Sequence, residues 1–496
     1  MNPIISYIHN KIWLMVAILA VFVGFLFVMP QILLWINIYE SNADFLLMQQ
    51  NVYRDEFFQY MPRAREVYDG HFPPGGIYAN DNNPTPLNPI TPLLFSFFIK
   101  LFRGDINIAY LSAQFLFAII FFILFYYLGT IFLRSKIPSL FFSLVGTLTQ
   151  IPQMLVGYSY IDDDYLGMII KKFIPLVRTP ISKMYFSRID DPMLTLGFLI
   201  LAILTTYLFW IKPTKINAIF AGLSIGLLAY VYLHYWLFMM VFIGLVFIYS
   251  LYNRTANDYK FKPVFLLCST IFLVLIPYIV NYLRFNFSGY SSDYSLRLGK
   301  EIGRFLVNDY ITNFSMGWTI LVNYLFYFIT LIAVYLFYFK KQADLIKKGV
   351  FFIGLIVTSF LVWYTPMITG FGFALFHFNK PISLVYFIII SSLLYDLFRT
   401  FFPTKSMFKS GIILFVVILS VSLVTKHIVN LSGFLYPPKD QIISYVFPGD
   451  IISSWKWVES NLSAESTVIS DSLVTSLYLG SYTSSRPYLA TGFLST

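Results

Sequence analysis

The sequence predicts a polytopic α-helical membrane protein with about eleven membrane-spanning helices, and three observations lead to this prediction. First, 58% of the 496 residues are hydrophobic and only 12% are charged, whereas soluble domains carry about 25% charged residues. Second, apolar runs of about 20 residues, the length needed to cross about 30 Å of hydrocarbon, recur along the chain. Third, the basic residues gather in alternate loops, as is typical of membrane proteins.

Each expected span is an apolar run bounded by polar residues. No small-residue cleavage site follows the first run, so we expect a retained helix rather than a signal peptide. The run Pro89–Leu101 is too short to cross, and we expect it to lie along the interface or to re-enter the membrane. The fifth and sixth spans should form a tight hairpin around His234-Tyr235-Trp236, and the tenth starts at Ser383 or earlier, near Phe373. In chain order the expected spans are Ile12–Trp35, Ile106–Leu133, Pro138–Leu155, Met193–Ile211, Ile216–Tyr232, Leu237–Tyr252, Pro263–Tyr282, Met316–Phe339, Val350–Gly370, Ser383–Leu397 and Ile412–Val429.

The distribution of Lys and Arg predicts the orientation of the chain. One set of alternate loops holds 15 of the 34 basic residues and only 3 of the 24 acidic ones, which leaves 19 basic and 21 acidic residues for the other side. Because cytoplasmic loops carry the excess of Lys and Arg, we expect the N-terminus in the cytoplasm and the C-terminal segment outside the cell membrane. The same rule accounts for the net charge of +10, so we expect membrane lipid as a partner and no nucleic acid.

Polar sequence is concentrated on the expected outer side, where a functional site has room to form. Long loops are predicted at 36–88, 156–192 and 283–315, and we divide the chain into a membrane domain, 1–429, and an extracytoplasmic segment, 430–496. We expect this segment to form a small α/β unit. No strand or helix that would complete the unit is obvious before the sequence ends, as in a truncated product. Its expected parts are a helix at Ile451–Leu462, a strand at Thr467–Ile469, a helix at Val474–Leu479 and a strand at Pro487–Leu489.

The first outer loop carries the adjacent acids Asp55 and Glu56, just before a short helix expected from Pro62 to Tyr68 and ended by Asp69-Gly70. A carboxylate at the membrane surface can act as a general base that deprotonates an acceptor hydroxyl or amine. The alternative is that both acids are solvated charges near a helix N-terminus, where acids are favoured anyway.

The second outer loop contains three consecutive carboxylates, Asp162, Asp163 and Asp164. Three neighbouring negative charges repel one another unless a cation or a basic group is close. Oxygen ligands suit a divalent cation such as Mg²⁺ or Mn²⁺, so these residues are candidates for metal or substrate binding. A solvated acidic turn, or pairing with nearby lysines, is the alternative.

Basic residues near the outer ends of the spans are candidates for binding a phosphate. We single out Arg178, Arg284 and Lys380, of which Lys380 follows His377 and lies close to the membrane. Contact with lipid headgroups, or a snorkelling lysine, would explain them equally well. The histidines show no HxxxH or HExxH spacing, so we expect no dedicated zinc site.

Taken together, these features resemble the GT-C superfamily of membrane glycosyltransferases, which includes the protein O-mannosyltransferases, the lipid A aminoarabinose transferase and the RgtA/B/C/D-like proteins. The resemblance rests on one N-terminal span, on an outer loop that carries Asp55-Glu56 and a helix ending at Gly70, and on Asp162–Asp164 between the third and fourth spans. The tail from Trp455 to Ser470 also resembles the outer segment of relatives, although it is short beside many of them.

The resemblance implies a function. A sugar would be transferred from a polyprenyl-phosphate donor to a lipid, glycan or protein acceptor on the outer face, with Asp55 as the base and Glu56 beside it. Arg178, Arg284 and Lys380 are the candidates for the donor phosphate, although no family motif places them. A polysaccharide polymerase or ligase, a lipid or sugar transporter and a non-catalytic scaffold are the competing interpretations.

Overall fold

The structure, a computed structural model, describes most of the chain. The described residues are 12–39, 60–75, 88–149, 151–155, 189–252, 261–287, 301–302, 314–339, 343–365, 371–372, 375–401, 406–435, 449–464, 466–471 and 473–488.

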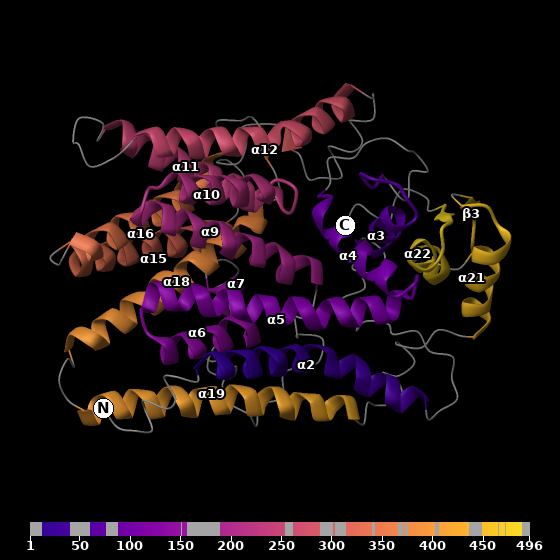
Figure 1. Cartoon of the computed structure of the whole chain (residues 1–496), viewed down its shortest axis with the longest axis horizontal. Coiled ribbons are helices and arrows are strands. Elements are labelled where there is room, and N and C mark those ends of the chain that lie inside the picture. The colour runs from indigo at the N-terminus through magenta and orange to yellow at the C-terminus, as the bar shows by residue number, and fades with distance from the viewer. Residues whose placement is uncertain are drawn as a thin grey trace.

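The described chain is a bundle of long helices that run side by side (Figure 1), and a helix lies at every expected span. Seven described helical segments are long and apolar enough to cross a membrane, which confirms the predicted α-helical polytopic fold. These segments lie in α2 (Ile12–Tyr39), α5 (Ile106–Leu133), α11 (Leu233–Tyr252), α12 (Phe261–Phe287), α16 (Ala343–Leu361) with the 3-10 turn η7 (Val362–Tyr364), α18 (Asn379–Phe401) and α19 (Ser406–Leu435).

Shorter apolar helices occupy the other expected spans. The expected third span is divided between two helices, and the fourth begins as a turn of π-helix, labelled η5. The elements concerned are α6 (Lys136–Leu148), α7 (Ile151–Met154), η5 (Ile189–Leu194), α9 (Thr195–Ile211), α10 (Lys215–Leu228) and α15 (Phe314–Tyr338).

The connection between the fifth and sixth expected spans differs from the prediction. Helix α10 ends at Leu228 and α11 starts at Leu233, so His234 and Trp236 lie in the first turn of α11 rather than in the hairpin turn. The turn itself is closed by Tyr232 N–H, which donates to the carbonyl of Leu228 at 2.8 Å. The polar His234 suggested a loop at this point of the sequence. It lies in a helix instead, beside the fully buried Tyr235.

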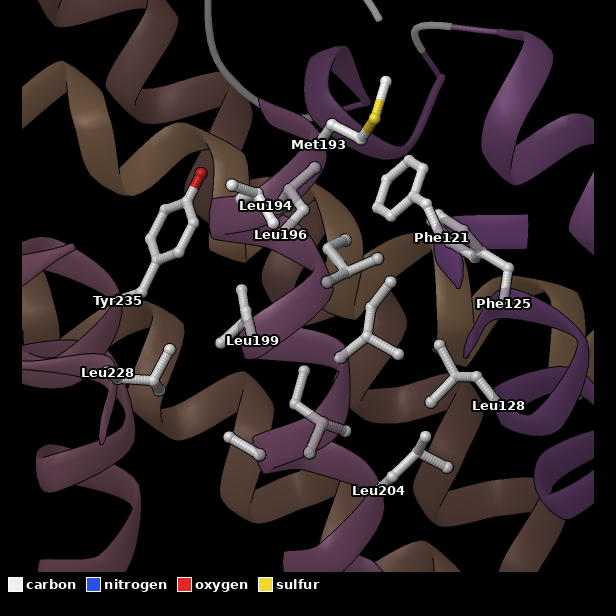
Figure 2. Close-up of a cluster of buried hydrophobic side chains, with 14 of the residues drawn as sticks. Phe121, Phe125, Leu128, Met193, Leu194, Leu196, Leu199, Leu204, Leu228 and Tyr235 are labelled. Atoms are coloured by element: carbon white, nitrogen blue, oxygen red, sulfur yellow. The ribbon is translucent and has the colours of Figure 1, made fainter. Parts of the chain in front are cut away.

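Helix packing places a large aromatic and aliphatic core in the middle of the bundle. Phe121 and Phe125 of α5 stack edge to face, with ring centroids 4.9 Å apart, and Phe125 also meets Phe142 of α6 and Phe387 of α18. Figure 2 shows Phe121 and Phe125 beside the buried leucines of η5 and α9. These contacts join segments from both halves of the chain around α5.

One end of the bundle, which we call the basic end, joins the ends of α5, α15, α16 and α18. Lys348 of α16 donates to the carboxylate of Asp396 at 2.7 Å and to the carbonyl of Phe132 at 2.8 Å. Tyr338 of α15 donates to the same carboxylate at 2.8 Å. Because the ends of α5, α15 and α18 meet the start of α16 here, α16 runs opposite to the other three helices.

The other end, which we call the loop end, carries the short elements of the long polar segments (Figure 1). Helices α3 (Met61–Tyr68) and α4 (Ile90–Leu101) lie there, between the bundle and the C-terminal element. Helix α3 ends at Tyr68, and Asp69 and Gly70 follow, Gly70 with a φ of +110° that suits glycine. The predicted stop at Asp69-Gly70 is therefore confirmed. Helix α4 has 12 residues and spans about 18 Å, too little to cross a membrane.

The C-terminal segment forms the small α/β element that the sequence predicts. Two short strands pair in parallel, Thr467 opposite Arg486 and Val468 opposite Pro487, and a helix connects them. Trp455 stacks on Tyr482 with ring centroids 5.2 Å apart, which holds the first helix of the element to the second. Its parts are α21 (Gly449–Asn461), β3 (Thr467–Val468), α22 (Leu473–Tyr482) and β4 (Arg486–Pro487).

Candidate functional site

Most of the candidate residues lie outside the described residues. These are Asp55 and Glu56 in the first loop, Asp162, Asp163 and Asp164 in the second, and Arg178. The two that are described are Arg284, exposed in the last turn of α12, and Lys380, the half-buried second residue of α18. Arg284 has no hydrogen bond or ion pair with another described residue. The site is therefore built from the elements that flank the candidates.

A group of aromatic and imidazole side chains lies at the loop end of α11 and α18. The hydroxyl of Tyr232 lies 2.5 Å from Nδ1 of His377, and the rings of His377 and His234 have centroids 4.8 Å apart. We call these three residues the histidine cluster. His377 belongs to a short 3-10 helix, η8 (Leu375–Phe378), which leads directly into α18, so Lys380 follows only three residues later.

The chemistry of the histidine cluster suits an anion. When the Tyr232 hydroxyl donates to Nδ1 of His377, the ring proton lies on Nε2, which makes that nitrogen a hydrogen-bond donor. Imidazole N–H groups and the Lys380 ammonium are donors of the kind that bind phosphate oxygens, and bonds to a charged oxygen are stronger than neutral ones. All three cluster residues are half-buried, which strengthens such contacts by limiting competition from water.

The segments that border the three long loops converge near this cluster. From the first loop, Ile90 N–H at the start of α4 donates to the carbonyl of Tyr230, two residues before Tyr232, at 3.2 Å. From the second, α7 packs against α18. From the third, the strand Glu301–Ile302 (β1) pairs antiparallel with Phe371–Gly372 (β2), just before η8. Acidic and basic loops far apart in sequence are thus attached to one end of the bundle.

A network of ion pairs joins α3 to the C-terminal element. Arg65 donates to Asp69 at 2.8 Å and to Glu459 of α21 at 2.5 Å. Beside it, Arg486 of β4 lies 3.4 Å from Glu66. We call the two pairs that cross between the elements, Arg65–Glu459 and Arg486–Glu66, the α3 clamp.

Burial and neighbouring charges shift the pKa values of the two carboxyls in the α3 clamp. Burial raises the pKa of the Glu66 carboxyl, and the charge of Arg486 and a hydrogen bond from Gly75 N–H offset part of that rise. Burial also acts to raise the pKa of Glu459, but hydrogen bonds from Ser484 and the charge of Arg65 outweigh it, so the pKa is lowered overall. Each carboxylate therefore has specific donors, Arg486 and Gly75 for Glu66, and Arg65 and Ser484 for Glu459.

Sequence reasoning missed two of these features. Tyr232 stood at the end of an apolar run, with no signal that its hydroxyl meets His377. Glu459 lay in the Trp455 to Ser470 segment used for the family resemblance, but its partner Arg65 is 394 positions away. Among the described residues, no three His, Cys, Asp or Glu side chains are grouped so that they could hold a metal ion.

The chain was compared with protein families, with curated proteins and with solved structures. No protein-family model matches the sequence, and no curated protein matches it. Among solved structures, the chain is similar to the archaeal oligosaccharyltransferase AglB from Archaeoglobus fulgidus, solved in complex with an inhibitory peptide and a dolichol-phosphate, with a TM-score of 0.51 and 13% identity. This likeness shows that the chain shares the fold of AglB. The shared fold extends over 99% of this chain, which spans 65% of the AglB chain.

Proposed function

We propose that the chain is a membrane glycosyltransferase that moves a sugar from a polyprenyl-phosphate donor to an acceptor at the loop end. The observation that carries this proposal is the convergence of the segments bordering all three long loops beside Tyr232, His377 and Lys380. The GT-C fold supports it, and AglB was solved with a dolichol-phosphate, a lipid of the proposed class.

The loop end faces the outside of the cell in this proposal. The basic end carries Arg134, Lys136, Lys212, Lys215 and Lys347 at helix ends or in the short connections between helices. Because Lys and Arg accumulate on the cytoplasmic side, the basic end lies in the cytoplasm, and the membrane domain, 1–429, presents the C-terminal segment, 430–496, on the outer side.

The donor enters with its lipid chain among the helices and its phosphate toward the histidine cluster. Lys380 and the imidazoles of His234 and His377 stabilise the phosphate as it leaves, with Arg178 and Arg284 as further candidates. Charge on the leaving phosphate oxygen increases in the transition state, so donors fixed on α11 and α18 lower the barrier more than mobile ones do.

The first loop supplies the base. Asp55 takes a proton from the acceptor hydroxyl or amine, the acceptor atom bonds to the sugar carbon, and the bond from that carbon to the phosphate oxygen breaks. Glu56 stands four residues before Tyr60, and four residues of extended chain span at most about 14 Å. Asp162, Asp163 and Asp164 bind the acceptor or a divalent cation, Mg²⁺ or Mn²⁺.

The direct test is transfer by the purified protein in proteoliposomes that contain a radiolabelled polyprenyl-phosphate sugar and a mixture of lipid and glycan acceptors. Label should move into acceptor, and the same sugar on a nucleotide should not replace the lipid donor. Label that crosses the bilayer still attached to its lipid would identify a transporter. Products that carry many sugars would identify a polymerase.

A further inference from the structure

The C-terminal element is attached to the first outer loop by contacts that exceed simple packing. Helix α22 packs against α3, and the Tyr482 hydroxyl donates to Oδ1 of Asn107, near the start of α5, at 3.2 Å. The α3 clamp adds two ion pairs to this interface. The C-terminal element therefore contacts both α3 and the start of α5.

We propose that Glu459 and Arg486 are positioning residues for the proposed transfer, which act by holding α3, the helix that follows the acidic pair Asp55-Glu56 in the chain. This inference rests on the proposed function. Tyr60, the residue before α3, follows Glu56 by four positions. A helix fixed at this distance fixes where the preceding carboxylates can reach.

The geometry favours a specific orienting role over general adhesion. Both α3 partners in the clamp are largely buried, with side-chain exposures of 9% for Arg65 and 11% for Glu66. Glu459 is itself oriented, because Ser484 donates to its Oε2 through both the backbone N–H, at 2.7 Å, and the hydroxyl, at 3.1 Å. Its other oxygen, Oε1, then accepts from Arg65.

The chain also explains why one pair would be insufficient. Arg65 is in the middle of α3, and its ion pair alone would leave the helix free to turn about that contact. Glu66 is the next residue and is rotated by about 100° around the helix axis. It therefore meets a second partner, Arg486 in strand β4. Two ion pairs in different directions restrict rotation as well as separation.

Glu459→Gln tests the proposal, because it removes the charge that Arg65 meets while keeping an amide oxygen for Ser484. Hydrogen exchange of the α3 amides should become about fivefold faster, the change expected from the loss of about 1 kcal/mol. The kcat for sugar transfer should fall about tenfold, with the KM for the lipid donor within about twofold of the parent value. A misplaced base slows the chemical step without altering donor binding.

Asp450→Asn is the matched control. It removes an exposed carboxylate from the first turn of the same helix, α21, where no hydrogen bond or ion pair joins it to the described residues of α3. This variant should match the parent in exchange and in kcat. The double variant Arg65→Gln with Glu459→Gln should behave like Arg65→Gln alone, because the second change then removes a charge that has already lost its partner.

Two results would overturn the proposal: parent-like exchange of α3 in Glu459→Gln, whatever its kcat, or faster exchange with unchanged kcat. If Glu459→Gln does not insert, Arg486→Gln removes the other pair and is judged by the same criteria. If the parent protein transfers no sugar, the proposed function fails, and the exchange measurement still decides whether the clamp holds α3.

Discussion

Arg65 and Glu459 are 394 positions apart in the sequence, yet a guanidinium nitrogen of the first donates to a carboxylate oxygen of the second at 2.5 Å. The contact joins α3, in the first long loop, to α21 of the C-terminal element. It also shows that the C-terminal segment is part of the loop end rather than an appendage. The predictions below start from contacts of this kind.

The pH dependence of this contact follows from the pKa of Glu459, which lies below its ordinary value of 4.5. A carboxyl with a depressed pKa contributes stability above its unfolded-state pKa and loses that contribution as pH falls through the folded-state value. The ratio of α3 exchange rates in Glu459→Gln and parent should therefore be large at pH 6 and decline toward one as the pH falls below 4.5.

The carboxyls of Glu66 and Asp69 have the opposite pH dependence. Burial raises the pKa of Glu66 and of Asp69, and their arginine partners offset this only in part. Their contributions are present at low pH and decline as pH rises. The contribution of Glu66 cancels in the ratio of rates, because that carboxyl remains in both proteins. The contribution of Asp69 cancels only in part, because the charge of Glu459 helps to raise the pKa of Asp69. A ratio that stays constant from pH 6 to pH 3.5 would contradict the assigned direction for Glu459.

The basic end depends on Lys348, whose ammonium meets Asp396 and the carbonyl of Phe132 inside the bundle. Lys348→Met leaves the Asp396 carboxylate buried without its cation, which should cost about 3–5 kcal/mol. Thermal unfolding in detergent measures the loss as a lower midpoint. Lys347→Met, at the exposed neighbouring position, should leave the midpoint unchanged, and equal midpoints for the two variants would refute the structural role of Lys348.

Helices α10 and α12 approach closely at two glycines. A Cβ added to Gly222 would lie 2.6 Å from Cβ of Thr270, and one added to Gly226 would lie 2.7 Å from Val274. Gly222→Ala should therefore separate the helices at a cost of about 1–3 kcal/mol. Gly244→Ala is the control, because nothing lies within 4 Å of its added Cβ, and thermal unfolding should distinguish the two.

The histidine cluster is tested by removing one hydroxyl. Tyr232→Phe keeps the ring but removes the partner of His377 Nδ1, so the imidazole loses its fixed orientation. If the cluster binds the donor phosphate, the KM for the lipid donor should rise about fivefold to tenfold, with kcat changed less. Tyr252→Phe, at an exposed position in α11, serves as the control. An unchanged donor KM in Tyr232→Phe would remove the cluster from the proposed phosphate site.

Sequence alone predicted the helices well because long apolar runs leave few alternatives in a membrane. The stop at Gly70 and the order helix, strand, helix, strand in the tail were also predicted, since turn residues and hydrophobic periodicity are local signals. The packing of the tail on α3 was not predicted, because an ion pair such as Arg486–Glu66 depends on tertiary contacts that no local pattern encodes. For the same reason, Tyr232 was assigned only to an apolar span.

The candidate site stays a prediction. Lys380 follows His377 of the histidine cluster by three residues, whereas Arg284 is exposed and joined to no described partner. The acids of the first two loops remain predictions, since they lie outside the described residues. Their roles therefore rest on the elements that border them, above all α3 and α7.

Asp55→Asn tests the central claim most directly. The change keeps size and polarity but removes the base, so sugar transfer from the polyprenyl-phosphate donor in proteoliposomes should fall about 100-fold or more. Insertion into the membrane and α3 exchange should match the parent. An Asp55→Asn protein that transfers sugar at the parent rate would contradict the account.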